Sequence, residues 1–503
     1  MLTLGFSLWS PARCIIASLP LLPHLKTLTF QTVLSWPSGP TPSPAPDLTQ
    51  LGSPYKWSPT YKWALTVVSC VSTLFASFAA RCYSPGAEQM ASEWQVSQVA
   101  ALVGITTFCC GFAIGPMFLV PFSEIYGRKP VFVATAILFT ICQLCCSVTR
   151  SYPGMLVARF FCGVGGSTFS TMVGGIVVDI FHASNRNTPM ALFSWAALFG
   201  TGLDPLVGGF IGEDTTWRWI FYIQIIVAGA ITLAVLIFFR ETRGPAPSPE
   251  KVTMPNRWNV AAEKEHASIL DMIRTSLLRP FTMLLTEPVV FFFSLWAAFS
   301  WSVLYINLSV IPLVFQSVYG LSLATANAIF AASCIGTTLA LFLSIGQETI
   351  AARYKQDWNS VPEHRLYCSC IQSLFLPIGL FLFGWSAHYH LHWMVSTVAV
   401  AISTIGIFSV YLSVFNYLAD GYHRYASSAL AAQSSCRNIM GGVFPLVSRQ
   451  MFDNMGFGAA ASLLGAVGAG LTLVPWVLVR CGPRIRRRSR LARERMDFDG
   501  VEE

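Results

Sequence analysis

The chain is poor in charge. Only 11% of its 503 residues are Asp, Glu, Lys or Arg, while 54% are hydrophobic. A soluble domain has roughly a quarter of its residues charged, and a single hydrophobic core stops growing at about 250–300 residues. A water-soluble fold of this length could not hide so much apolar surface, so the composition excludes a soluble protein.

Other absences exclude enzyme classes. The sequence contains no Gly-Lys-Ser/Thr phosphate loop, so ATP is not expected to drive it. Its 14 cysteines show no repeated metal-ligand spacing and behave as small hydrophobes; Cys142 and Cys145 form a lone two-residue-gap pair. His388, His390 and His392 alternate without a carboxylate, which favours no metal. We expect no enzymatic activity and no cofactor.

Long apolar runs fill most of the chain. A membrane-spanning helix needs about 20 mostly apolar residues. Twelve such stretches occur, at residues 63–82, 97–120, 131–149, 154–178, 189–212, 219–239, 289–315, 325–345, 367–385, 393–418, 425–448 and 458–480. They predict an all-α membrane protein with twelve transmembrane helices in two six-helix bundles.

The positive charges lie on one side of this arrangement. With twelve spans and a cytoplasmic amino terminus, 26 of the 32 Lys and Arg fall on the cytoplasmic side. Four fall outside (Arg81, Arg150, Arg218 and Arg449), and Arg159 and Arg437 fall within spans. The positive-inside rule therefore places both termini in the cytoplasm. The basic run 484–490 is interpreted as a stop-transfer and headgroup contact rather than a nucleic-acid patch.

Composition divides the chain into five parts. Residues 1–56 are poor in acids and rich in proline, which predicts a disordered cytoplasmic tail; a signal or transit peptide is the alternative. Residues 57–239 form the first six-helix bundle, 240–288 a basic cytoplasmic loop, 289–480 the second bundle and 481–503 a basic tail. A long middle loop between two six-span halves is typical of transporters built from parallel repeats.

The polar turn between the second and third apolar runs carries a definite pattern. It places Glu124 before Gly127-Arg128-Lys129, with two residues between them. This turn resembles the loop between spans two and three of the major facilitator superfamily, a large class of secondary transporters. The fifth run contains Gly200, Gly202, Pro205 and Gly208-Gly209, which resembles the glycine-proline element of that superfamily's antiporters. Glycines permit close helix packing, and proline permits a kink.

Further matches resemble one branch of the superfamily, the fungal twelve-span drug:proton antiporters. They cover about residues 57–488 and stand at 57–63, 217–222, 362–367, 376–381, 416–420 and 428–446. The resemblance implies a cytoplasmic gate formed by Glu124, Gly127, Arg128, Lys129 and Asp179. The alternative is a solvated turn that only sets topology.

Two charged residues are candidates for proton coupling. Arg159 matches the arginine that the family keeps early in span four; the alternative is an arginine that reaches the outer interface. Asp204 departs from the family, which has glycine before this proline. A buried carboxylate can take up a proton near neutral pH, which suits a coupling site. A structural acid, a local variation or impaired gating are the alternatives.

Spans one, four, seven and ten usually line the cavity in this superfamily. Here they supply the substrate-cavity candidates Ser72, Ser77, Thr171, Trp296, Tyr305, Asn307, Tyr411 and Asn416. Apart from Arg159, none of the four spans carries a charge at mid-span, so we expect a nearly uncharged cavity for a bulky, partly hydrophobic compound.

The resemblance implies a secondary active transporter that exports drugs, polyamines or secondary metabolites by proton antiport. The alternatives are a nutrient importer of the same superfamily and a non-transporting membrane sensor. The expected partners are a small-molecule substrate, protons and the lipid bilayer, with no nucleic acid and a monomeric state. We expect a multi-pass protein of the cell membrane, with the vacuolar membrane as the alternative.

Overall fold

The computed structural model describes residues 54–181, 185–242, 278–354, 366–422 and 426–488. Over these ranges the backbone forms helices and turns and no strand. In lipid a spanning segment must satisfy its backbone hydrogen bonds internally, which a helix does. The predicted all-α membrane fold is confirmed.

The first half of the chain contains six long helices, and serine side chains begin several of them. Ser58 caps α1 and Ser97 caps α3, each accepting a hydrogen bond from a backbone N–H in the first turn. The helices are α1 (Pro59–Arg81), the short α2 (Ala87–Trp94), α3 (Gln98–Tyr126), α4 (Arg128–Val148), α5 (Tyr152–Ile180), α6 (Asn187–Asp214) and α7 (Arg218–Phe238).

The second half begins with a helical stretch at 278–286 and repeats six long helical segments, some of them built from two helices. They are α9 (Pro288–Ser317), α10 (Leu323–Ala328) with α11 (Ala331–Tyr354), α12 (Tyr367–Gln372) with α13 (Phe375–His388), α14 (Trp393–Tyr422), α15 (Ala426–Met455), and α16 (Phe457–Leu471) with α17 (Leu473–Arg488).

Eleven helical segments of the described ranges are long and apolar enough to cross a membrane. Helix α15 is not among them, although it has 30 residues. Its sequence is interrupted by Gln433, Ser434, Ser435, Arg437 and Asn438, all of which are buried. Helix α15 nevertheless coincides with the predicted eleventh span, 425–448, and these polar side chains face protein.

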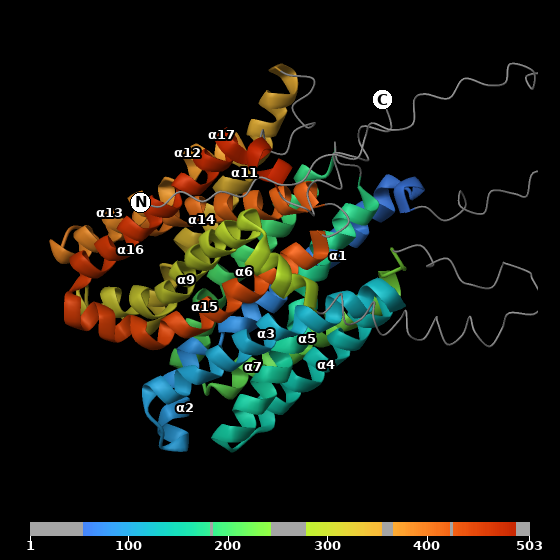
Figure 1. Ribbon diagram of the computed structural model, residues 1–503. Helices are drawn as coiled ribbons and strands as arrows, with labels where there is room; N and C mark the ends of the chain where they lie inside the picture. Colours follow the sequence, from blue (N-terminus) through green and yellow to red (C-terminus); the bar gives the residue numbers. More distant parts are fainter. Residues whose placement is uncertain (1–53, 182–184, 243–277, 355–365, 423–425, 489–503) are drawn as a thin grey trace, which may run out of the picture. The chain divides into compact units, whose positions relative to one another are not determined.

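The helices of each half pack mainly on one another. In the first half α3 packs on α5, α5 on α4 and α4 on α7, and α1 packs on α6; in the second, α13 packs on both α14 and α16. Figure 1 shows α3, α4, α5 and α7 side by side, in blue to green. The halves meet where α15 packs on α3 and where α11 packs on α6, with α9 packed on α15. A site placed between the halves is therefore built from both.

One sequence assignment is wrong. Arg81, placed outside the membrane by the charge count, lies in the last turn of α1 and is only 1% exposed. Residues 1–53, 243–277 and 489–503, which hold most of the expected tails and middle loop, lie outside the described residues. The division of the chain into five parts stays a prediction.

Candidate functional site: a charged centre between the two halves

The Gly127 turn is built around a carboxylate from elsewhere in the chain. Glu241, which follows α7, accepts hydrogen bonds from the backbone N–H groups of Arg128 (2.8 Å) and Lys129 (3.0 Å). A carboxylate at a helix amino terminus is favoured by the helix dipole. Gly127 has φ +94°, and a β-carbon there would lie 2.5 Å from a Glu241 oxygen, so glycine is required on both counts.

The gate residues occupy this turn as follows. Arg128 pairs with Asp179 of α5, with Nε 2.6 Å from Oδ2. Glu124 lies in the last turns of α3, and its side chain is not among those described. The Arg128–Asp179 pair joins α4 to α5 and so stays within the first half. Sequence reasoning missed Glu241, whose only signal was an acid directly after a span.

A different cluster joins the two halves at the Gly127 end of the helices. The guanidinium of Arg186, just before α6, lies 3.3 Å from the carboxylate of Asp420 at the end of α14. Both side chains are less than one-tenth exposed. Next to them Asn187 donates to Glu348 of α11 (2.8 Å) and accepts from Asn416 of α14 (3.0 Å). These contacts hold the halves together at this end.

The opposite end, called here the Glu213 end, has its own contacts between halves. Glu213, near the end of α6, accepts a hydrogen bond of 2.5 Å from the backbone N–H of Ala324 in α10. Arg449 of α15 donates to Gln98 of α3 (2.8 Å). A recess of about 450 Å³ opens at this end, lined by Ser84, Pro85, Ala87, Glu88, Gln98, Leu102, Leu308, Ser309, Pro312, Leu313, Gln316, Ser317, Leu323, Asn327 and Arg449.

The glycines of α6 allow it to pack closely on both halves. A β-carbon at Gly200 would overlap the carbonyl oxygen of Leu74 in α1. On the other face, a β-carbon at Gly202 would lie 3.0 Å from the Cys334 sulfur of α11. Pro205 lies inside this helix. The two remaining glycines of the element pack in the same way, Gly208 against Pro85 and Gly209 against Asn327.

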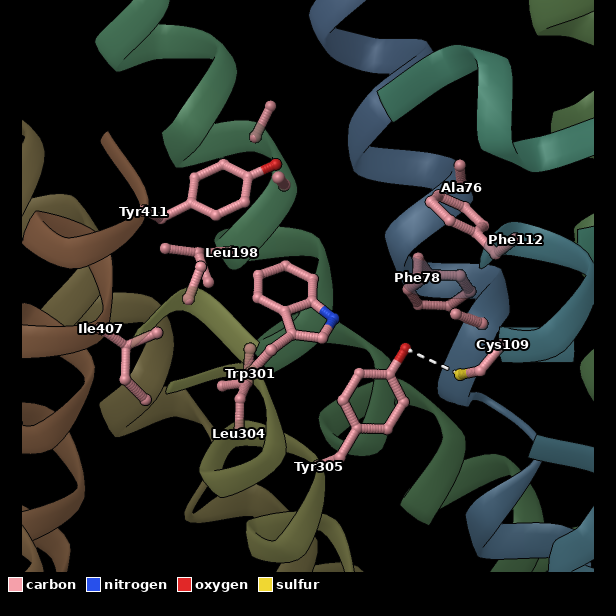
Figure 2. Close-up of a cluster of buried hydrophobic side chains, with 14 of the residues drawn as sticks. Ala76, Phe78, Cys109, Phe112, Leu198, Trp301, Leu304, Tyr305, Ile407 and Tyr411 are labelled. Carbon is pink, nitrogen blue, oxygen red and sulfur yellow. Dashed lines mark hydrogen bonds between the residues drawn. The ribbon is translucent and has the colours of Figure 1, made fainter. Parts of the chain in front are cut away.

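An aromatic cluster occupies the centre, between the two sets of contacts. Trp301 and Tyr305 project from α9, and Tyr411 of α14 stacks on Trp301 with a centroid distance of 5.3 Å (Figure 2). The Cys109 thiol of α3 lies 3.4 Å from the Tyr305 hydroxyl. A cavity of about 10 Å³ remains here, enough for about one water molecule. It is lined by Ser77, Ala80, Arg81, Phe112, Ser170, Thr201, Trp301, Tyr305 and Asn438.

Two arginines flank this cluster. The guanidinium carbon of Arg81 lies 3.8 Å from the ring centroid of Tyr305 and 5.4 Å from that of Trp301. That of Arg437, from α15, lies 4.3 Å from the Trp301 centroid and 4.9 Å from that of Tyr411. In the described residues none of the three Arg81 nitrogens has a hydrogen-bond partner, nor do Nε and Nη1 of Arg437. The expectation of a nearly uncharged cavity is therefore wrong.

Asp204 lies deep in α6 with no exposed surface. Neither carboxylate oxygen has a hydrogen-bond partner among the described side chains and backbone. The groups that act on its charge are the cations of Arg81 and Arg159 and the thiol of Cys82. The sequence placed Asp204 correctly at mid-span but gave no sign that Arg81 is its neighbour.

Arg159 is buried in α5 and does not reach an outer interface. It donates to three backbone carbonyl oxygens, those of Ala79 (2.9 Å) and Ala80 (2.6 Å) in α1 and of Gly104 (3.3 Å) in α3. Its guanidinium also lies over the ring of Phe108. Arg159 thus fixes the end of α1 that carries Arg81.

The predicted cavity residues divide into two groups. Ser77 and Tyr305 line the central cavity, and Tyr411 stacks on Trp301 beside it. The others lie elsewhere on the same helices: Ser72 donates to Val68, Thr171 donates to Ser167, Trp296 packs on Phe293, Asn307 is buried in α9, and Asn416 bonds Asn187 at the Gly127 end. Over the described ranges no group of three or more His, Cys, Asp or Glu residues could hold a metal ion.

Two half-bundles with a buried polar centre and separate contacts at each end define the architecture of a membrane transporter. The family model of the Major Facilitator Superfamily matches residues 69–445. The chain therefore belongs to the Major Facilitator Superfamily, a family of multi-pass membrane transporters and not of enzymes. The family membership predicted from the sequence is confirmed.

Curated relatives place it more narrowly. The chain is 32% identical over 446 residues to the multidrug transporter TPO1_1 of Candida glabrata, covering 87% of this chain and 78% of the relative. It is 31% identical over 449 residues to the multidrug transporter mdrA of Aspergillus fumigatus, covering 88% and 74%. Within the superfamily it falls among these fungal multidrug transporters and efflux pumps.

Solved structures support the fold alone. The proton:xylose symporter XylE bound to 6-bromo-6-deoxy-D-glucose aligns with a TM-score of 0.61 and 16% identity, over 84% of this chain and 97% of that one. The human organic anion transporter MFSD10 aligns with a TM-score of 0.56 and 14% identity, over 84% and 100%.

Proposed function

We propose that the protein exports small organic compounds, such as drugs, polyamines or secondary metabolites, in exchange for protons. The relatives at about 30% identity are named as multidrug transporters and efflux pumps, which supports export. The observation that carries proton coupling is Asp204, a fully buried acid without a hydrogen-bond partner among the described residues, on the helix that packs against both halves.

The direction of each opening follows from the proposed topology. With both termini in the cytoplasm, the Gly127 end faces the cytoplasm and the recess of about 450 Å³ opens to the outside. Both sets of contacts are formed in this structure: the Arg186–Asp420 cluster on the cytoplasmic side, and the contacts of Glu213 and Arg449 on the outer side. We propose that the two sets form and break in alternation, because a transporter must expose its site to one side at a time.

Asp204 and Arg159 have different parts in this cycle. Asp204 takes up and releases the proton, since burial favours its neutral form while the nearby cation of Arg81 favours its ionised form. Arg159 is a positioning residue, because its hydrogen bonds to Ala79, Ala80 and Gly104 are used to hold α1 and α3. The protein works as a monomer in the cell membrane and binds no nucleic acid.

Flux measurements on the purified full chain in liposomes test this function. An imposed pH gradient and a panel of cationic, neutral and anionic fluorescent drugs are used, and proton and drug movements are recorded together. Opposite movement of drug and protons is the expected result. Movement in the same direction would identify an importer, and the absence of any gradient-dependent flux across the panel would leave a sensor; either outcome rejects the proposal.

A further inference from the structure

The centre of the protein holds more positive charge than the fold requires. Arg159 uses its donors on backbone carbonyls and so has a structural reason to be buried. Arg81 and Arg437 have no comparable set of hydrogen bonds. Both side chains are at most 1% exposed, and five of their six guanidinium nitrogens lack a hydrogen-bond partner among the described residues. Among the described residues, the acid that acts on Arg81 is Asp204.

Unused donors on a buried cation are costly. A buried charge normally persists only when it is paired and hydrogen-bonded. The rings of Tyr305 and Trp301 attract the two guanidinium groups, but such cation–π contacts do not replace hydrogen bonds to the N–H groups. Charged groups inside a membrane protein that lack a structural partner mark a substrate or ion path.

The positions of the two arginines suit one ligand. One guanidinium carbon lies 5.4 Å and the other 4.3 Å from the centroid of Trp301, so the two lie within about 10 Å of each other. A carboxylate accepts paired hydrogen bonds from arginine, and a flat ring attached to it would pack against the edges of the indole and phenol rings of the same cluster. We propose that the substrate is an aromatic or other amphipathic organic anion, whose acidic group binds Arg81 and Arg437.

The same geometry disfavours a cationic substrate such as a polyamine. A cation would need the faces of Trp301, Tyr305 and Tyr411, and guanidinium groups already lie over all three rings. It would also be repelled by two buried positive charges at close range. A protonated Asp204 adds no negative charge to offset them.

A route to this site runs along α9 and α3. In α9, Leu308 lines the recess, and Tyr305, one turn away, lines the central cavity. In α3, Leu102 lines the recess and Phe112 the central cavity. Cys109, which lies between these two residues of α3, contacts Tyr305. Because the central cavity has only about 10 Å³, the anion enters as this contact opens.

The proposal rests on the proposed transport function, but binding tests it separately. Three probes of one shape are compared on the purified full chain in detergent at a single pH: 2-naphthoate, neutral 2-naphthamide and the cation 2-naphthylmethylammonium. We expect naphthoate to bind about tenfold or more tightly than the amide, because hydrogen bonds to charged groups are stronger than those to neutral ones. Equal binding of all three, or tighter binding of the amide or the cation, would overturn the proposal.

Variants then identify the residues. Arg81→Gln and Arg437→Gln are each expected to remove most of the preference for naphthoate over naphthamide. Arg218→Gln, which breaks a surface pair with Glu93, is the matched control and should keep it. A preference unchanged in both arginine variants would overturn the assignment, and the three-probe comparison on the native protein decides the substrate class even if a variant does not fold. Naphthoate binding without proton-linked flux would reject the proposed function and leave the anion site standing.

Discussion

Replacing Asp204 by asparagine separates proton coupling from transport. The change keeps the size of the side chain and removes its ability to ionise. Asp204 is fully buried and lacks a hydrogen-bond partner among the described residues, so the neutral amide enters a site that already suits a neutral group. We therefore expect the protein to fold and to exchange substrate for substrate at close to the native rate.

The effect on energetics follows from the proton count. One pH unit corresponds to about 1.4 kcal/mol per proton, so a transporter that exchanges one proton per substrate can hold an approximately tenfold substrate gradient per pH unit. With the membrane potential clamped at zero, the native protein in liposomes should approach this ratio. Asp204→Asn should reach a ratio of about one at any pH difference, because no proton moves with the substrate.

The assay compares the steady substrate ratio across the liposome membrane in the native protein and the variant. Asp214→Asn is the matched control, since it changes the same residue type at the exposed end of the same helix. It should keep the native gradient. A gradient of native size in Asp204→Asn would refute the reasoning and remove this carboxylate from the mechanism.

Three further predictions concern packing and gating. Gly200→Leu should destabilise the protein by about 1–3 kcal/mol, seen as a lower melting temperature, because the side chain would overlap α1, while Gly229→Leu, which meets no atom within 4 Å, should not. Glu241→Gln should lower the unfolding free energy by about 0.5–2 kcal/mol in a denaturant titration, since it weakens a carboxylate cap on two N–H groups; an unchanged midpoint would contradict this. Arg186→Gln leaves Asp420 without its buried partner, so the Gly127 end should open more often and water-soluble reagents should label it faster; Lys at this position should restore part of the protection.

Apolar runs predicted the spans because lipid imposes a simple rule on any chain that crosses it. A run of about 20 apolar residues must be helical, whatever its neighbours are. The rule becomes weak where a helix is enclosed by protein. Helix α15 is less apolar than a typical span because it contains polar residues such as Gln433, Arg437 and Asn438, which are buried in the interior. The sequence still predicted it, because residues 425–448 are among the twelve mostly apolar stretches.

The site was harder to predict because its parts come from distant segments. Asp204 could be placed at mid-span from its flanks, but its neighbour Arg81 stands at the end of a run and was assigned to the outside. In the structure, α1 packs against α6 and other helices, and Arg81 is buried among them. The partner of the Gly127 turn, Glu241, follows a span more than 100 residues later and belongs to no pattern that the turn itself carries.

The central claim is that the two ends of the molecule open in alternation. Spin labels carried by unnatural amino acids test it directly, with one pair at Tyr126 and Ile350 near the Gly127 end and another at Glu88 and Gln316 beside the recess. These residues are exposed and belong to opposite halves. When pH or substrate is changed, we predict that one distance lengthens as the other shortens. Distances that stay fixed, or that lengthen together, would contradict the account.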